Sequence, residues 1–598
     1  MGEFLVRNVK AIVSALCLAI LPLSTMAADM TKTLDVAFVT SPTGFDPAKV
    51  SDAYSMGINS NIFDPLVTYD YLARPASLIP NTIEAMPVIT NDGKTYTLKI
   101  QPGIFFSADP IFGGEPRELT AADYVYSIKR HLDPTINSPW SYLVDGKFVG
   151  ADEMVAAANG GPLDYDTEVQ GLRALDKYTL EITLTATNFN FMYVLATDAF
   201  GAVAREVIEG YADNTNAHPV GTGPYLLTAG ETSNVIELVA NPDFRDMTFN
   251  FVSDPTDPVS VQVAADQAGK QIPIIGNIRI HVIEEEQPVW LSFLNGELDY
   301  TGIPQPALRE ALVINPDDPL DVRLADEFVA QGMSLQRQQA LEVTYTFFNM
   351  ADPVVGGYEP AQIALRRAIA LAFPLNEIIA RIRRGQSVPM QYVVPEGVAG
   401  NNPNFQGQTG YDPAQANALL DAAGYAIGAD GMRTRPDGSP LSIELATGTS
   451  AIDREWNEFY QQTFDSIKVT LTFKEGQWSE LAKENRDGTL QMWGLAWGAD
   501  YPDGDNFMQL LYGPNTGDAN AAGFDHPDYN RMYEESLLLP DGPERQALYD
   551  AMNEIVVGFQ PWIFGDIRVG STIIRPNVKG LMVHPILNNA WRYVDLVE

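Results

Sequence analysis

Cysteine is almost absent from this chain. The single cysteine, Cys17, lies inside the first apolar run, and no thiol follows it. Leu16 stands before it, where a lipid-attachment site needs a small residue, so lipidation is not expected. Without further cysteines the protein has neither disulfides nor thiol chemistry, and its stability must come from burial of apolar side chains.

Histidine and the short motifs of catalysis are also scarce. The five histidines all lie more than four residues apart: His131, His218, His281, His526 and His584. HExxH, CxxC, GxSxG and P-loop motifs are missing, so the sequence supports no zinc site, hydrolase elbow or nucleotide loop. We therefore expect no metal, no cofactor and no enzyme. A secreted hydrolase stays open only as a distant alternative.

Basic residues are few. The chain has 38 Lys and Arg against 77 Asp and Glu, a formal net charge of −39. Such a balance argues against nucleic acid or anionic lipid as a partner. Because an acidic surface also improves solubility, this charge does not identify a ligand.

Long apolar runs are limited to the beginning of the chain. Arg7 and Lys10 precede the apolar residues 11–23, and small residues follow at 25–27. This pattern is typical of a secretory signal, with cleavage expected after Ala27 or Ala28. No later run suggests a membrane span. The sequence therefore predicts a soluble periplasmic protein without direct membrane insertion.

The rest of the chain mixes strand and helix patterns, which indicates an α/β fold. Apolar residues alternate with polar ones in several short segments, while Thr120 and Asp123 form a capping box before a helical pattern. Expected strands cover 34–39, 96–100, 180–184 and 278–283; expected helices follow residue 120 and cover 360–373, 377–384 and 413–423. Residues 219–225, PVGTGPY, are interpreted as a tight turn entering a strand, because a third glycine is lacking and Pro224 has no N–H.

The segment 495–507, LAWGADYPDGDNF, concentrates polar and aromatic groups in what we predict to be a loop. Its conspicuous side chains are Trp497, Asp500, Tyr501, Asp503, Asp505 and Asn506. A carboxylate at Asp500 beside two aromatic faces suits a ligand ammonium, since the rings exclude water and strengthen the ion pair. A solvated acidic turn is the alternative. The spacing does not match a calcium loop, in which a glutamate completes the shell.

Seven motifs in a fixed order resemble those of the family 5 extracellular solute-binding proteins, the peptide-binding and dipeptide-binding receptors of ABC importers. They are GFDP at 44–47, NIFDPLVTYD at 61–70, YTLKIQPGIFFS at 96–107, ELTAADYVYSIKRHLDP at 118–134, PVGTGPYLL at 219–227, LRRAIALAFPLNEII at 365–379 and WGADYPDGDNF at 497–507. The resemblance covers essentially all of the chain after the signal.

This resemblance implies a two-lobed clam, class II-like, with two hinge crossings and an extra subdomain inserted in lobe I. The implied boundaries are 1–27 for the signal peptide, 28–70, 200–302 and 569–598 for lobe I, 71–199 for the insertion and 303–568 for lobe II. The chain is longer than typical members, with uninterpreted inserts near 249–275 and 308–341.

The resemblance also implies a ligand site. Asp500 occupies the position that holds the α-ammonium of a bound peptide, within the segment that contains Trp497 and Tyr501. The other implied ligand-binding residues are Ala496 and Gly498, Ser51, Ala53 and Tyr54, and Tyr142 of the insertion. Ala496, Gly498, Ser51 and Ala53 are expected to pair their backbone with an extended peptide.

By this resemblance the protein captures a short peptide or peptide-like solute between its lobes and delivers it to ABC permease subunits in the inner membrane. We expect a monomer. The alternative is a receptor for an oligosaccharide or another non-peptide solute, which would stack on Trp493 or Trp497. No arginine matches a ligand-carboxylate partner, and Arg366 and Arg367 are expected to form structural ion pairs.

Overall fold

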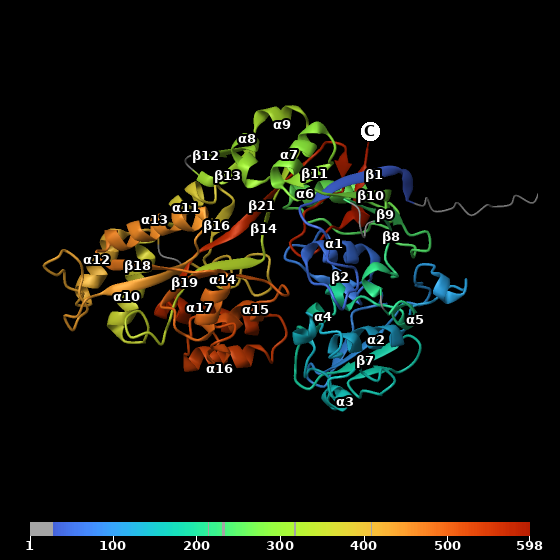
Figure 1. Cartoon of the computed structure of the whole chain (residues 1–598), viewed down its shortest axis with the longest axis horizontal. Helices are drawn as coiled ribbons and strands as arrows, with labels where there is room; N and C mark the ends of the chain where they lie inside the picture. Colours follow the sequence, from blue (N-terminus) through green and yellow to red (C-terminus); the bar gives the residue numbers. More distant parts are fainter. Residues whose placement is uncertain (1–27, 213, 230–233, 316–317, 408–409, 598) are drawn as a thin grey trace, which may run out of the picture.

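The computed structural model describes residues 28–212, 214–229, 234–315, 318–407 and 410–597, so the predicted signal lies outside the described residues. The chain forms two α/β lobes that are joined by long strands (Figure 1). Elements from both ends of the chain build the first lobe, on the right of the figure, and the part between about 340 and 565 builds the second.

The first lobe contains a four-stranded sheet of order β1-β10-β9-β8. Its strands are β1 (Asp29–Phe38), β8 (Tyr225–Ala229), β9 (Val235–Ala240) and β10 (Ile275–Val282). β1 and β10 run parallel with Leu34 opposite Ile278, and both side chains are buried. The predicted strands at 34–39 and 278–283 are thus confirmed, as is the turn into β8.

A second sheet of the first lobe lies below this one in Figure 1. Its order is β4-β5-β7-β6, from β4 (Val88–Thr90), β5 (Thr95–Lys99), β6 (Leu172–Ala174) and β7 (Thr179–Thr183). Helix α2 (Ala121–Leu132) packs on β6 and β7 and begins at the predicted Thr120–Asp123 capping box. Tyr96 of β5 and Leu180 of β7 are buried in the core that this sheet shares with α2.

The second lobe is organised around a five-stranded sheet of order β18-β17-β19-β15-β20. The strands are β15 (Glu342–Phe348), β17 (Ser442–Thr447), β18 (Thr470–Glu475), β19 (Met492–Gly498) and β20 (Trp562–Phe564). Its helices are α10 (Pro360–Leu371), α11 (Leu375–Arg381), α12 (Pro413–Ala422), α13 (Ala451–Ser466), α14 (Trp478–Arg486), α15 (Asp505–Met508), α16 (Pro527–Ser536) and α17 (Pro543–Phe559). The three helices predicted between 360 and 423 are confirmed.

Strand β21 (Asp566–Ile574) links the lobes. It pairs with β16 (Ser387–Pro389) of the second lobe, with β11 (Tyr300–Gly302) beside the first, and along its length with β14 (Ser334–Gln339). The two chain segments β14 and β21 therefore pass between the lobes.

The described residues of the two uninterpreted inserts form helices and strands. The first contains α6 (Pro258–Gln267), and Phe249 and Val263 pack against Tyr71 and Tyr593 of the first lobe. The second forms α8 (Leu308–Ala311), the β12 (Leu312–Asn315) and β13 (Asp318–Leu324) hairpin and α9 (Asp326–Ala330), which share a core with α7 (Glu286–Asn295). The remaining elements are α1 (Ala53–Ile62), β2 (Val67–Tyr69), β3 (Leu78–Pro80), α3 (Ala151–Ala158), α4 (Phe191–Val194), α5 (Arg205–Gly210), β22 (Val578–Lys579) and β23 (Asp595–Leu596).

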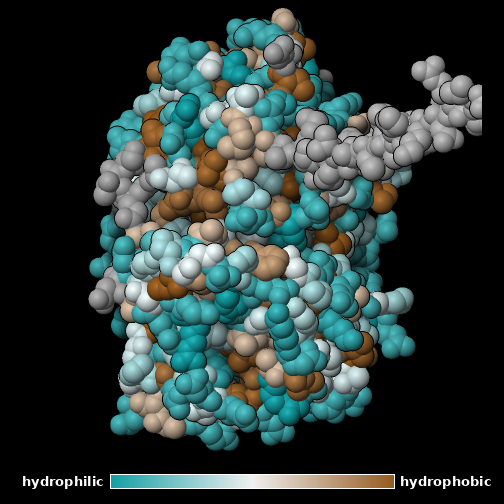
Figure 2. Space-filling view, turned by 90° about the vertical axis from the view of Figure 1, so that its right-hand side faces the viewer, coloured by the Kyte–Doolittle hydropathy of each residue, from teal (hydrophilic) through white to brown (hydrophobic). Residues whose placement is uncertain are grey.

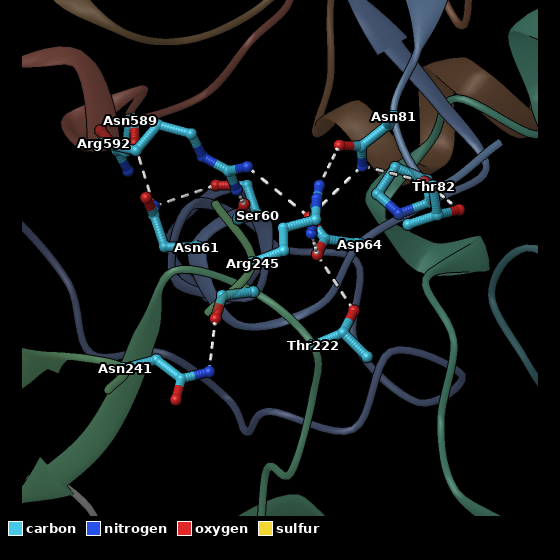
Figure 3. Close-up of polar contacts among 12 residues, drawn as sticks. Ser60, Asn61, Asp64, Asn81, Thr82, Thr222, Asn241, Arg245, Asn589 and Arg592 are labelled. Atoms are coloured by element: carbon cyan, nitrogen blue, oxygen red, sulfur yellow. Dashed lines mark hydrogen bonds and ion pairs between the residues drawn. The ribbon is translucent and has the colours of Figure 1, made fainter. Parts of the chain in front are cut away.

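A buried polar network ties the distant parts of the first lobe together (Figure 3). The Asp64 carboxylate accepts from Arg245 at 2.6 Å and from the Thr222 hydroxyl at 3.0 Å, and Arg592 lies 3.6 Å away. Burial opposes the charge of Asp64, but the two guanidinium groups outweigh it and lower its pKa to about 2. Segments near residues 64, 245 and 592 are thereby held to one another.

The surface is mainly hydrophilic on the face that Figure 2 shows, with apolar residues confined to smaller patches. This is the appearance that the acidic composition predicts. Among the residues that the structure describes, no helix is both long and apolar enough to cross a membrane.

Two local predictions were wrong. Residues 495–498 are the end of strand β19 rather than loop, because they continue the ladder with β15, and Asp505 begins the one-turn helix α15. Arg366 forms no ion pair with a carboxylate of the described residues. It is buried and donates to the carbonyl oxygens of Phe559 and Gln560, which end α17, and of Val355.

Candidate ligand-binding site

Strand β19 has one paired edge and one edge that is mostly free. On one side, all seven of its residues pair with β15, from Met492 opposite Phe348 to Gly498 opposite Glu342. On the other side, β17 pairs only with Met492 and Trp493. Beyond Trp493, this edge has no strand beside it among the described residues. An extended ligand can therefore form main-chain hydrogen bonds there.

Small residues keep the surface of this strand open. Gly494, Ala496 and Gly498 alternate on one face and are all exposed. A Cβ atom added to Gly494 would meet only the Thr346 Oγ1 at 3.7 Å, and one added to Gly498 would meet nothing within 4 Å. Since neither glycine has a positive φ, the fold does not require glycine here. Glycine inside a strand often marks the close approach of a ligand or another backbone.

The loop after β19 fixes Asp500 through Asn506. The Asn506 amide donates to the Asp500 carboxylate at 2.8 Å, and its Oδ1 accepts from the Asp500 main-chain N–H and the Trp497 indole N–H, both at 3.1 Å. Asn506 is buried, whereas Asp500 remains accessible. The carboxylate is thus held by a rigid neighbour with its other oxygen free to accept.

The surroundings of Asp500 suit a cationic partner. Partial burial raises the pKa of Asp500, while the hydrogen bond from Asn506 opposes this rise. Desolvation, and then the charge of Asp500, raise the pKa of the Tyr142 hydroxyl to about 12. Tyr142 belongs to a 3₁₀ turn of the first lobe (Ser141–Leu143) and is 54% exposed. The structure therefore brings Asp500 and Tyr142 near each other from opposite lobes.

Tyr501 lies where the lobes touch. Its ring stacks on Tyr193 of the first lobe, with centroids 6.2 Å apart and an interplanar angle of 11°. Its hydroxyl donates to Asp505 at 3.2 Å. Nearby, Arg545 pairs with Asp503 at 2.7 Å and donates to Asn190 of the first lobe at 3.4 Å. A cavity of about 370 Å³ lies between the lobes beside these groups.

Ser51, Ala53 and Tyr54 lie at or just before the beginning of α1, where an extended backbone had been expected for Ser51 and Ala53. Ser51 is exposed, but Ala53 is the first helical residue and so offers an amide N–H rather than a strand edge. The Tyr54 ring packs against Phe38 with centroids 5.0 Å apart. Within the described chain, no hydrogen bond, ion pair or ring contact joins Ser51, Ala53 or Tyr54 to Asp500.

Two features of the site were not predicted from the sequence. Asn506 has no sequence signature for its positioning role, because its hydrogen bond reaches back six residues around a loop. Gly494 was missed because the strand that contains it was not predicted. Within the ranges that the structure describes, no group of three His, Cys, Asp or Glu side chains is placed to hold a metal ion.

Comparison with known proteins finds one matching family and several similar proteins. The profile of the bacterial extracellular solute-binding proteins, family 5 Middle, matches residues 77–519. Heme-binding protein A of Haemophilus influenzae is 23% identical over 93% of this chain and 91% of its own length. Di/tripeptide-binding protein 2 of Pseudomonas aeruginosa is 23% identical over 93% of each chain.

A solved structure shares the fold. The periplasmic murein tripeptide-binding protein MppA, in its unliganded open form, superposes with a TM-score of 0.72 and 20% identity, over 96% of this chain and 99% of that chain. The family profile covers most of the sequence, and the fold is the two-lobed one that the motifs implied. This chain therefore belongs to the family 5 bacterial extracellular solute-binding proteins.

Proposed function

We propose that the protein is the periplasmic receptor of an ABC importer and captures a short peptide or peptide-like solute between its two lobes. The observation that carries this proposal is the accessible Asp500 carboxylate, fixed by Asn506 at the end of the free edge of β19, and Tyr142 of the other lobe lies near enough to feel its charge. A ligand ammonium placed there makes an ion pair with one lobe and meets an aromatic ring from the other.

The free edge of β19 also supports a peptide as the ligand. A peptide that leaves its ammonium at Asp500 can run along Gly498, Ala496 and Gly494 and add a strand to the sheet. Main-chain pairing tolerates varied side chains. Ser51, Ala53 and Tyr54 remain proposed contacts from the first lobe, where the Ala53 N–H is a free donor at the start of α1.

For the domain plan we propose two hinge crossings at β14 and β21, and an inserted subdomain at 71–199 built around the β4-β5-β7-β6 sheet. The motifs imply 28–70, 200–302 and 569–598 for lobe I and 303–568 for lobe II, but we propose that 303–333 also belongs to lobe I. Because α8 to α9 pack with α7, the first crossing is placed at β14. The loaded receptor would act as a monomer and dock on permease subunits.

Isothermal titration calorimetry with di- to tetrapeptides tests the ammonium assignment. Asp500→Asn keeps the size of the side chain but removes its charge, and should weaken peptide binding by about 3 kcal/mol, roughly 100-fold. N-acetylation of the best peptide should weaken binding to the parent protein by a similar factor and hardly affect the variant.

Asp518→Asn is the matched control, since it removes one exposed carboxylate that lies outside the segment 495–507. It should bind as the parent does. If Asp500→Asn binds free and acetylated peptides as tightly as the parent, the ammonium assignment is wrong. Binding of an oligosaccharide that survives Asp500→Asn but is lost with Trp497→Ala would favour the sugar receptor instead.

A further inference from the structure

A cavity of about 350 Å³ opens beside the free edge of β19 in the second lobe. One wall is the strand itself, from Trp493 to Ala496, and the end of β17 forms another. Helices α13 and α14 close it with Trp456 and Trp478. We call this cavity the tryptophan pocket, after Trp456, Trp478 and Trp493.

The indole of Trp478 is unusually exposed for so large a ring. It is 66% exposed and lies 4.8 Å from the Trp493 ring, at an angle of 46°. Trp456 faces the Arg383 guanidinium at 5.2 Å. Three of the eight tryptophans of the chain thus line one cavity. Exposed apolar surface that continues into a cavity is typical of a binding site.

The charged side chains that line the pocket are already paired. Arg383 donates to Asp566 at 2.6 Å, and Arg568 binds Glu342 through two nitrogens. Asp453 caps α13, where it accepts from the Ser450 main-chain N–H at 2.9 Å and its hydroxyl at 2.6 Å. An acidic ligand group would therefore lose its hydration without gaining a free counter-charge, and a basic one would meet only Asp453, whose carboxylate already accepts the two hydrogen bonds from Ser450.

The position of the pocket relative to Asp500 sets which part of a ligand reaches it. Strand residues advance about 3.3 Å each, so the run from Gly498 to Gly494 spans roughly 13 Å. A peptide with its ammonium at Asp500 and its chain antiparallel to β19 covers this length with about four residues. Its third or fourth side chain then lies over the pocket.

We propose that the tryptophan pocket is the specificity site of the receptor and selects an uncharged aromatic side chain at the third or fourth ligand residue. This inference rests on the proposed peptide-binding function. A flat ring in the cavity can pack against the exposed Trp478 indole, where aromatic pairs add to the gain from burial, and the pocket is large enough for phenylalanine or tryptophan.

Calorimetry tests the proposal with the tetrapeptides AAAA, AAFA, AAEA and AAKA, and with the peptides that carry the same substitutions at position four. The parent protein should bind the tighter of the two phenylalanine peptides at least tenfold more tightly than AAAA. It should bind the glutamate and lysine peptides more weakly than AAAA. In Trp478→Ala the ratio of phenylalanine to alanine affinities should fall below threefold. Tyr411→Ala, which removes another exposed ring of the second lobe, should keep the parental ratio.

A probe without ammonium or peptide backbone separates the pocket from the Asp500 site. 5-Fluoroindole, followed by ¹⁹F NMR, should bind saturably to the parent and to Asp500→Asn but not to Trp478→Ala. Binding of the probe without any peptide binding would reject the peptide function and keep the pocket as an aromatic site for another solute. Failure of the probe to bind, equal binding to Trp478→Ala, or a preference for AAEA or AAKA would overturn the proposal.

Discussion

At the scale of single residues, two carboxylates in one loop have opposite surroundings. Asp500 is accessible and held by Asn506, whereas Asp505 is buried beside Asp503, Arg545 and Tyr501. Burial, and then the charge of Asp503, raise the pKa of Asp505 above its usual range. One carboxylate is thus available to a ligand, while the other favours its protonated form inside the fold.

The buried carboxyl makes stability depend on pH. Because the folded state keeps a proton on Asp505 that the unfolded chain releases above about pH 4, stability should fall as pH rises from about 5 to 8. Asp505→Asn removes this contribution, so urea midpoints measured at pH 5 and pH 8 should differ less in the variant than in the parent. Asp518→Asn, which also removes one negative charge, should retain the parental difference. An equal pH dependence in Asp505→Asn and the parent would show that Asp505 ionises normally.

At the scale of elements, β19 has a structural role at one edge and, by our proposal, a recognition role at the other. Its ladder with β15 holds the lobe together, while β17 ends beside Trp493 and leaves the rest of the opposite edge uncovered among the described residues, and the glycines at 494 and 498 add no side chain there. Glycine inside a strand costs about 0.5–1 kcal/mol relative to alanine, and neither position needs it for backbone or space. The two glycines therefore lower the stability of the strand at the positions that a ligand would approach.

Gly494→Val separates the two roles. The β-branched side chain should leave the melting temperature unchanged or raise it, because valine favours strands and the added Cβ meets only Thr346. Peptide affinity should fall by at least tenfold, since the side chain enters the ligand path. Gly494→Ala should show a smaller loss. Thermal unfolding and calorimetry on the same samples check both effects, and a stable variant with full affinity would remove Gly494 from the site.

At the scale of the whole molecule, the proposed site takes residues from both lobes, so we expect ligand binding to be linked to lobe movement. Asp500 and the tryptophan pocket belong to the second lobe and Tyr142 to the first, and β14 and β21 connect the lobes. A ligand can favour a closed arrangement only to the extent that it binds that arrangement more tightly.

Small-angle scattering can measure this linkage. The best tetrapeptide should decrease the radius of gyration of the parent, because the bound ligand bridges the lobes. Asp500→Asn at the same peptide concentration should keep the radius of the free protein, and so should the parent with an acetylated peptide. A decrease of equal size in the variant at that concentration would mean that closure does not depend on the ammonium contact.

The sequence predicted most of the elements because their causes are local. Alternating apolar residues placed Tyr96 and Leu180 in strands, and the Thr120–Asp123 box marked the beginning of α2. It missed the strand at 495–498, because that assignment depends on β15, about 150 residues earlier. Motif order gave the two-lobed fold, and the roles of Asp500 and the other site residues stay predictions.

By itself, the sequence determined the family, the acidic surface and the position of most helices and strands, since composition, periodicity and motif order are properties of short segments. Only the tertiary structure decided that Asn506 holds the Asp500 carboxylate, that β17 ends early and leaves an edge of β19 uncovered, and that three tryptophans share one cavity. These contacts join residues far apart along the chain, and only long-range packing brings them together.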